Sequence, residues 1–432
     1  MEYESATPLD LNRPGIAGWT ALSRAACNGC ENVVKLLLAH SHADGASLPA
    51  LDTNRGDSNG VTALMHAAAN TQVAVVKLLL AHEGSAASRI DVNRADTQGA
   101  TALSKACAAG DVDVVQALLA YDRRPRIDIN KRRSNGDTPF FAACRSNTAA
   151  AVQALVEHGA DLERRGIRRN RGRDLIDINA PMSGMDGSTA LYNACFAGAT
   201  EVVEKLLTYP GLDVNKAEAG DGNTPLYAAC WQKHAAIVRL LLAAEAIDVN
   251  KARSSDGEHP LYIACYQGDA QIVVDLLSHK DIDVNQVEKQ STNSPFYAAC
   301  WFGHTEVVVA MLKDYAEKKE TGTVPEVALL NFQKGRRVDG ETPLQIACQQ
   351  GHLQIVAELV AFVDGGHINE ISKEGETVLY SMCWASKHEC VGMLVQHPEI
   401  DMNQPATLDG NTPHAGRMPA PRLHGGSGFD QR

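Results

Sequence analysis

Residues 222–230 read Gly-Asn-Thr-Pro-Leu-Tyr-Ala-Ala-Cys, and the same pattern returns along most of the chain. Thr224 is suited to cap a helix, and Pro225 is tolerated at the first helical position, where its missing N–H is not needed. The small residues that follow favour a short helix. The stretch therefore predicts a helix that begins directly after Thr224.

A second helix and a turn complete each copy of the motif. In Val202-Val203-Glu204-Lys205-Leu206-Leu207 the apolar residues recur at i, i+1, i+4 and i+5, which is the spacing of one face of a helix. A small residue such as Gly198 separates the two helices. An Asp-x-Asn element such as Asp248-Val249-Asn250 then leads to the next copy, because Asp and Asn favour turns. Each copy is thus predicted to be a helix–turn–helix unit.

The capping position of the motif occurs eleven times along the chain. Successive copies lie 35 residues apart where no insertion intervenes, as between Thr189 and Thr224. Ten copies are complete, and the eleventh stops after the motif itself. The capping positions are Thr20, Thr62, Thr101, Thr138, Thr189, Thr224, His259, Ser294, Thr342, Thr377 and Thr412.

This pattern resembles the ankyrin repeat, whose signature is D-x-x-G-x-T-P-L-H-x-A, a Gly turn, a V-V-x-x-L-L helix and a D-V-N hairpin. The resemblance implies an all-α solenoid of helix–turn–helix units joined by β-hairpin-like loops. Stacked units of this kind build one continuous core, and each unit touches only the next. The chain departs from the signature mainly by carrying Tyr where the family has His, at Tyr192, Tyr227, Tyr262, Tyr297 and Tyr380.

The repeats also predict the domain organisation. We expect a solenoid over residues 10–413, preceded by an N-terminal extension at 1–9. Insertions interrupt the period near 40–59, 164–185 and 313–339. The tail 414–432 is rich in Gly, Pro and Arg, and we expect it to be disordered. The 432 residues are therefore interpreted as one repeat domain rather than the three domains that the length alone suggests.

Charge and hydropathy narrow the range of functions. The formal net charge of −12 argues against nucleic acid or an anionic membrane as the main partner. No apolar run approaches 18 residues, so we expect no membrane insertion. The polar start of the sequence shows no secretory signal, and we therefore expect a cytoplasmic or nuclear, reducing location. We also expect a monomer.

Eight cysteines share one position of the repeat, six residues after the cap. Adjacent units stack about 10 Å apart, whereas a disulfide needs Cα atoms within about 7 Å, so we expect buried thiols that act as small apolar residues. No nucleophile–base constellation or metal-ligand set stands out, and we expect no enzyme, cofactor or metal site. The eight are Cys107, Cys144, Cys195, Cys230, Cys265, Cys300, Cys348 and Cys383.

The resemblance also indicates where a partner would bind. Ankyrin repeats usually dock partners on their concave face, which includes the residue before the cap and the seventh and eighth residues after it. Trp and Tyr are enriched in interface hot spots, so aromatic residues at these positions are predicted to bind a partner. Packing of the rings on one another and on the tyrosine position explains them equally well. The aromatic candidates are Trp19, Phe196, Trp231, Tyr266, Trp301, Phe302 and Trp384.

Three binding hypotheses follow. The first is a non-catalytic scaffold or adaptor that binds another protein or peptide on the concave face. The second, by analogy with some ankyrin modules, is a reader of cationic or methylated side chains, with Trp231, Tyr266 and Trp301 as an aromatic cage.

The third hypothesis is nucleic-acid or acidic-partner binding through a basic insert. Residues 123–173 carry a surplus of eight positive charges, and the remainder of the chain carries −20, which weighs against nucleic acid. A solvated loop without a binding role is the alternative. The insert contains Arg164, Arg165, Arg168, Arg169, Arg171 and Arg173.

Overall fold

The computed structural model describes residues 10–40, 50–83, 89–164, 176–181, 187–290, 292–322, 325, 329–331, 340–363, 365–372 and 375–404. The predicted N-terminal extension, the tail 414–432 and the eleventh capping residue Thr412 lie outside these residues, as do parts of the three predicted insertions. The chain divides into two compact units, Met1–Ser255 and Asp256–Arg432.

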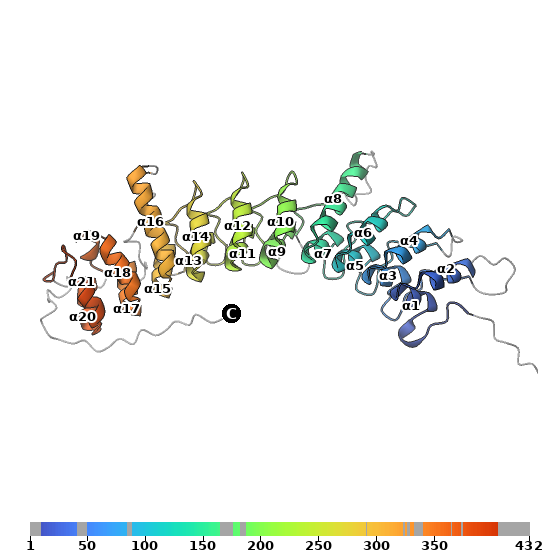
Figure 1. Cartoon of the computed structure of the whole chain (residues 1–432), viewed down its shortest axis with the longest axis horizontal. Helices are drawn as coiled ribbons and strands as arrows, with labels where there is room; N and C mark the ends of the chain where they lie inside the picture. Colours follow the sequence, from blue (N-terminus) through green and yellow to red (C-terminus); the bar gives the residue numbers. More distant parts are fainter. Residues whose placement is uncertain are drawn as a thin grey trace, which may run out of the picture. The chain divides into compact units, whose positions relative to one another are not determined.

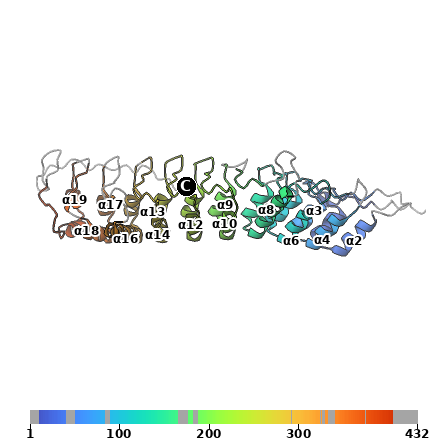
Figure 2. The same cartoon turned by 90° about the horizontal axis from the view of Figure 1, so that it is seen from above.

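The first unit stacks six helix pairs in chain order (Figure 1). We call the first helix of each pair inner and the second outer. Successive inner helices contact one another, and so do successive outer helices. The loops between pairs line up along one edge of the unit, away from the outer helices (Figure 2). The elements are η1 (Ile16–Gly18), α1 (Ala21–Cys27), α2 (Glu31–His40), α3 (Ala63–Ala69), α4 (Val73–Ala81), α5 (Ala102–Ala109), α6 (Val112–Leu119), α7 (Pro139–Arg145), α8 (Ala149–Arg164), α9 (Ala190–Ala197), α10 (Thr200–Leu207), α11 (Pro225–Trp231) and α12 (Ala235–Leu242).

The second unit stacks four more pairs and one short helix. Its inner helices are α13, α15, α17 and α20. Within the described residues the chain forms no β-strand, only an isolated bridge between Ile371 and Thr377. The predicted all-α helix–turn–helix fold is therefore confirmed. The elements are α13 (Pro260–Gln267), α14 (Ala270–Leu277), α15 (Pro295–Phe302), α16 (Thr305–Thr321), α17 (Pro343–Gln350), α18 (Leu353–Phe362), α19 (Gly365–Ile368), α20 (Val378–Trp384) and α21 (His388–Leu394).

The inner helices begin where the capping residues predict. The hydroxyl of Thr224, for example, accepts the backbone N–H of Tyr227 at 3.1 Å. Nine of the ten inner helices have such a Thr or Ser cap, and proline is the first residue of five of the ten. The exception is α13, where His259 takes the capping position and makes no side-chain cap hydrogen bond.

Seven of the eight predicted core cysteines are buried thiols, as expected. Burial raises the pKa of Cys195 and Cys265 above the ordinary thiol value, so these groups stay protonated. The prediction is wrong for Cys383, which is exposed. In earlier repeats the next inner helix covers this position, but no inner helix follows α20 among the described residues.

The Asp-x-Asn element, for which the sequence pattern indicates only a turn, links consecutive repeats by hydrogen bonds. The side chain of Asn54 donates to the carbonyl of Arg89 at 2.7 Å and accepts the N–H of Asp91 at 2.7 Å. Both groups belong to the following repeat, so each asparagine fixes the position of the next loop. The same pair of hydrogen bonds is made by Asn12, Asn93, Asn179, Asn215, Asn285 and Asn369.

A histidine packs over the turn glycine of the preceding repeat. The Nε2–H of His352 donates to the carbonyl of Trp301 at 3.1 Å. A Cβ atom added to Gly303 would lie only 2.6 Å from the Cε1 atom of the same histidine ring. Gly303 has φ +77°, which disfavours a side chain as well. The glycine and the histidine are therefore matched across the repeat boundary.

This match predicts a difference between two glycines of the second unit. Gly303→Ala is expected to destabilise the chain by about 1 kcal/mol more than Gly351→Ala, as measured by urea unfolding. Both glycines have positive φ, which costs an alanine roughly 1–2 kcal/mol. Only Gly303 has a neighbour within 4 Å of the added methyl group, and moving His352 breaks a hydrogen bond. Equal losses would show that the histidine does not restrict this turn.

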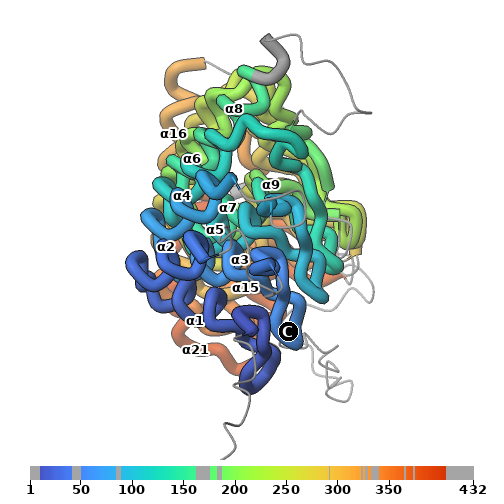
Figure 3. The backbone as a smooth tube through the Cα atoms, turned by 90° about the vertical axis from the view of Figure 1, so that its right-hand side faces the viewer, coloured from blue at the N-terminus to red at the C-terminus, as the bar shows by residue number. Residues whose placement is uncertain are grey.

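Two outer helices are longer than the rest. α8 has 16 residues and α16 has 17, against 7 to 10 in the other outer helices. The extra turns of α8 reach past α4 and α6 (Figure 3). In α16 the additional turns are held in place, because Lys318 donates to the carbonyl of Leu277 and Tyr315 packs edge-on against Phe362.

Candidate partner-binding surfaces

The structure places six of the seven aromatic candidates in the last turn of an inner helix. Four of them are exposed: Phe196 (47%), Trp231 (37%), Phe302 (39%) and Trp384 (45%). No other Phe or Trp within the described residues is exposed to this degree. Tyr266, Trp301 and Trp19 are half-buried, and Trp19 lies in the loop before α1.

Three of the candidate rings pack on the tyrosine that lies one helical turn earlier in the same inner helix. Tyr227 stacks on Trp231 with ring centroids 6.2 Å apart and is itself only 3% exposed. The same stacking joins Tyr192 to Phe196 and Tyr262 to Tyr266. Packing and exposure therefore both hold for Trp231: the buried Tyr227 covers one side of its ring and leaves the other side to solvent.

In the second unit aromatic rings of two neighbouring repeats lie at the ends of α13 and α15. Tyr266 at the end of α13 meets Phe302 at the end of α15 edge-on, with centroids 4.6 Å apart. His304 stacks on Phe302 and its Nε2–H donates to the carbonyl of Tyr266 at 2.9 Å. Trp301, the residue before Phe302, packs on Tyr297 at 5.9 Å. We call Tyr266, Trp301 and Phe302 the α13–α15 aromatic cluster.

A carboxylate is fixed beside this cluster. Glu341, directly before α17, accepts a hydrogen bond from the amide of Gln349 at 2.6 Å and another from the hydroxyl of Tyr297 at 3.4 Å. Tyr297 is the ring on which Trp301 packs. The cluster therefore has a negatively charged group at its α17 side.

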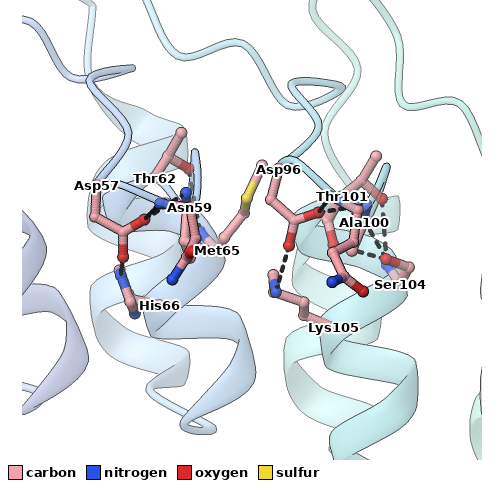
Figure 4. A network of polar contacts seen from close by, with 12 residues as sticks. Asp57, Asn59, Thr62, Met65, His66, Asp96, Ala100, Thr101, Ser104 and Lys105 are labelled. Carbon is pink, nitrogen blue, oxygen red and sulfur yellow. Dashed lines mark hydrogen bonds and ion pairs between the residues drawn. The ribbon is translucent and has the colours of Figure 1, made fainter. Parts of the chain in front are cut away.

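The second and third repeats carry polar contacts that the sequence analysis does not predict (Figure 4). Asp57 accepts two backbone N–H groups of its own loop and a hydrogen bond from His66 Nε2 at 3.1 Å. Asp96 has the same arrangement in the next repeat, where the Nζ atom of Lys105 lies 2.8 Å from its carboxylate. Burial lowers the pKa of His66 despite the neighbouring carboxylate. The sequence does contain an indication of these contacts, because both aspartates stand five residues before a capping Thr.

Trp19 is enclosed by this network. Its ring centroid lies 4.0 Å from that of His66, and the guanidinium of Arg24 lies 4.1 Å from the ring. Both groups come from inner helices of the first two repeats. Of the seven aromatic candidates, Trp19 is therefore the one whose ring is already engaged by cationic and aromatic neighbours.

The other two hypotheses stay predictions. The rings of the proposed cage belong to different units, with Trp231 in the first and Tyr266 and Trp301 in the second. In the basic insert, Arg164 is the last residue of α8. The remaining members lie outside the described residues: Arg165, Arg168, Arg169, Arg171 and Arg173.

Comparison with known proteins identifies the family. A family model for ankyrin repeats matches residues 5–96, 85–166, 170–253, 245–322 and 324–406. The chain therefore belongs to the ankyrin-repeat family. Members of this class generally serve as protein–protein interaction modules.

Two solved structures illustrate the likeness, whereas no curated protein matches the chain. The human ASB11 ankyrin repeat domain is 23% identical, with 61% of this chain and 99% of that chain covered and a TM-score of 0.46. The ankyrin repeat domain of Bcl-3, described as a unique member of the IkappaB protein family, is 24% identical, with 60% and 98% covered and a TM-score of 0.46.

None of the described helices is long and apolar enough to cross a membrane. In the same part of the chain, no group of three or more His, Cys, Asp or Glu side chains is arranged to hold a metal ion.

Proposed function

We propose that this chain is a non-catalytic interaction module that binds another protein or peptide through the aromatic ends of its inner helices. One observation carries the proposal: among the described residues, every exposed Phe and Trp lies in the last turn of an inner helix. Rings scattered without a role would also appear on outer helices and loops.

The way the rings are held favours binding. Each of Phe196, Trp231 and Trp301 packs against the tyrosine one turn earlier, so less side-chain freedom remains to be lost when a partner binds. Aromatic anchors of this kind act as interface hot spots, and truncating one costs about 2 kcal/mol or more.

The α13–α15 aromatic cluster also indicates the chemistry of its partner. Apolar anchors would cover Phe302 and Tyr266, and a basic side chain beside them would meet the carboxylate of Glu341. We therefore propose an apolar segment with a flanking Lys or Arg. The chain acts as a monomer in a reducing cytoplasmic or nuclear environment, which suits its buried thiols.

The test compares exposed side chains of two faces in the full chain. Trp231→Ala and Phe302→Ala are each expected to lower the amount of captured partner at least tenfold in quantitative affinity capture, since the loss of a hot spot weakens binding by roughly that factor. The matched control is Val274→Ala with Val309→Ala, two exposed apolar residues of the outer helices α14 and α16.

The outcome is read with circular dichroism as a folding check. Helical content should be unchanged in all variants, because the substituted side chains are exposed. Capture that survives both aromatic substitutions, or that falls equally in the valine control, would contradict the proposal.

A further inference from the structure

A second surface of different chemistry runs along the loops of the first unit. In each of the first four repeats a cation directly follows the Asp-x-Asn element: Arg13, Arg55, Arg94 and Lys131. Each has the same backbone geometry, because its N–H donates to the carbonyl of the aspartate three residues earlier, at 3.1 to 3.5 Å. All four side chains are exposed. We call these four residues the loop-edge cations.

Unlike two cations of the neighbouring inner helices, the loop-edge cations have no carboxylate partner among the described residues. Within the described residues none of the four takes part in an ion pair. Two inner-helix cations of the same repeats, in contrast, are paired: Lys105 with Asp96 at 2.8 Å and Arg145 with Asp137 at 2.8 Å. The row therefore presents positive charges that still lack a partner.

The row has a defined end. The fifth repeat carries Ala180 at this position. Lys216 and Lys251 follow in the sixth repeat and in the loop after it, but both are half-buried, and the ammonium of Lys251 donates to the carbonyl of Asn215 at 2.9 Å. Within the first unit, an exposed cation at this turn position is therefore confined to the first four repeats.

The spacing of the row is fixed by the asparagines that precede it. Asn12, Asn54 and Asn93 each hydrogen-bond to the next repeat, so neighbouring loop-edge cations lie one repeat apart, about 10 Å. A polyproline II segment has three residues per turn and rises about 3.1 Å per residue, so every third side chain points the same way about 9 Å further on. An acidic residue at every third position would meet successive cations.

The aspartates of the same loops argue against a phosphate backbone as the occupant. Asp10, Asp52 and Asp91 are exposed and stand three residues before Arg13, Arg55 and Arg94. A nucleic-acid strand carries a negative charge about every 3.4 Å and would bring phosphates against these carboxylates. A peptide avoids that repulsion, because neutral residues can occupy the positions between its acidic ones.

We propose that the loop-edge cations Arg13, Arg55, Arg94 and Lys131 form a docking row for an extended acidic peptide whose Asp or Glu residues recur at every third position. This surface lies on the loops, whereas the proposed aromatic sites lie on the inner helices. The row can therefore be tested separately from the proposed function.

The experiment uses the full chain and two labelled peptides of equal composition. One contains four Glu-Pro-Ser repeats, and the other places its four Glu together at one end. Fluorescence anisotropy at low salt is expected to show the spaced peptide binding about tenfold more tightly than the clustered one. Arg55→Ala combined with Arg94→Ala should weaken that binding about tenfold, since each exposed ion pair contributes a few-fold. Added NaCl should weaken it further.

The matched control is Lys216→Ala, which alters the same turn position beyond the break in the row and is expected to leave the affinity unchanged. A twelve-residue single-stranded DNA serves as the competing ligand. Equal affinity for the two peptides, no effect of the double variant, or tighter binding of the DNA than of the spaced peptide would each overturn the proposal.

Discussion

Replacing Phe296 with alanine is expected to lower the free energy of unfolding by about 3–5 kcal/mol, among the largest effects of a single core substitution. Phe296 lies in α15 and is completely buried. Its ring borders Leu344 and Leu359 of the next repeat, and the cavity they share is only about 10 Å³. Because the surrounding structure collapses only partly into the space of a deleted side chain, the loss includes both the buried ring and the cavity it leaves.

The control for this prediction is Phe296→Leu. Leucine occupies the same repeat position at Leu226, Leu261 and Leu344, so this substitution is expected to cost less than about 1.5 kcal/mol. Urea unfolding of the full chain, followed by circular dichroism, measures both values. An alanine variant that unfolds at the same urea concentration as the wild type would show that the ring does not hold the two repeats together.

Acid is expected to destabilise the second unit through His259. This histidine replaces the usual capping Thr before α13 and is fully buried. Its Nε2–H donates to the carbonyl of Gln286 at 3.1 Å, while its Nδ1 has no hydrogen-bond partner. Burial lowers the pKa of His259 to about 4, although the Gln286 carbonyl and Asp283 act in the opposite direction.

The sign of the pH effect follows from these values. The unfolded chain binds a proton at His259 near pH 6.5, whereas the folded chain does so only near pH 4. Stability is therefore fully present above pH 6.5 and falls between about pH 6.5 and pH 4, by about 3 kcal/mol in total.

Urea unfolding at pH 7 and at pH 4.5 measures this loss in the wild type and in His259→Thr. The variant lacks the buried imidazole, so its loss should be smaller by about 2–3 kcal/mol. Other histidines, such as the partly buried His66, contribute equally to both proteins and cancel in the comparison. The same pH dependence in both proteins would mean that His259 is not the group responsible.

The sequence predicts the fold well because repetition reports each structural position many times. A Thr before Pro or Ala marks the start of seven inner helices, and Ser294 and Thr377 mark two more; the cap hydrogen bond is present in all nine. The exposure of Phe196, Trp231 and Phe302 follows from their repeat position in the same way.

Other features depend on contacts between repeats, which a one-dimensional pattern does not contain. The Asn54 side chain bonds to residues 35 and 37 positions further on, and the enclosure of Trp19 requires Arg24 and His66 from two different helices. Cys383 shows the limit of extending a repeat rule to the last described pair, where the covering helix is missing.

Site-specific photo-crosslinking tests whether a partner binds at the aromatic ends of the inner helices. A benzophenone amino acid is placed at Phe302, at Trp231, or at the exposed outer-helix residue Val274, and the full chain is irradiated in cells. We predict a crosslinked partner from Phe302 or Trp231 and none from Val274. Crosslinks that form from Val274 but not from either aromatic position would place the partner on the outer helices and contradict the claim.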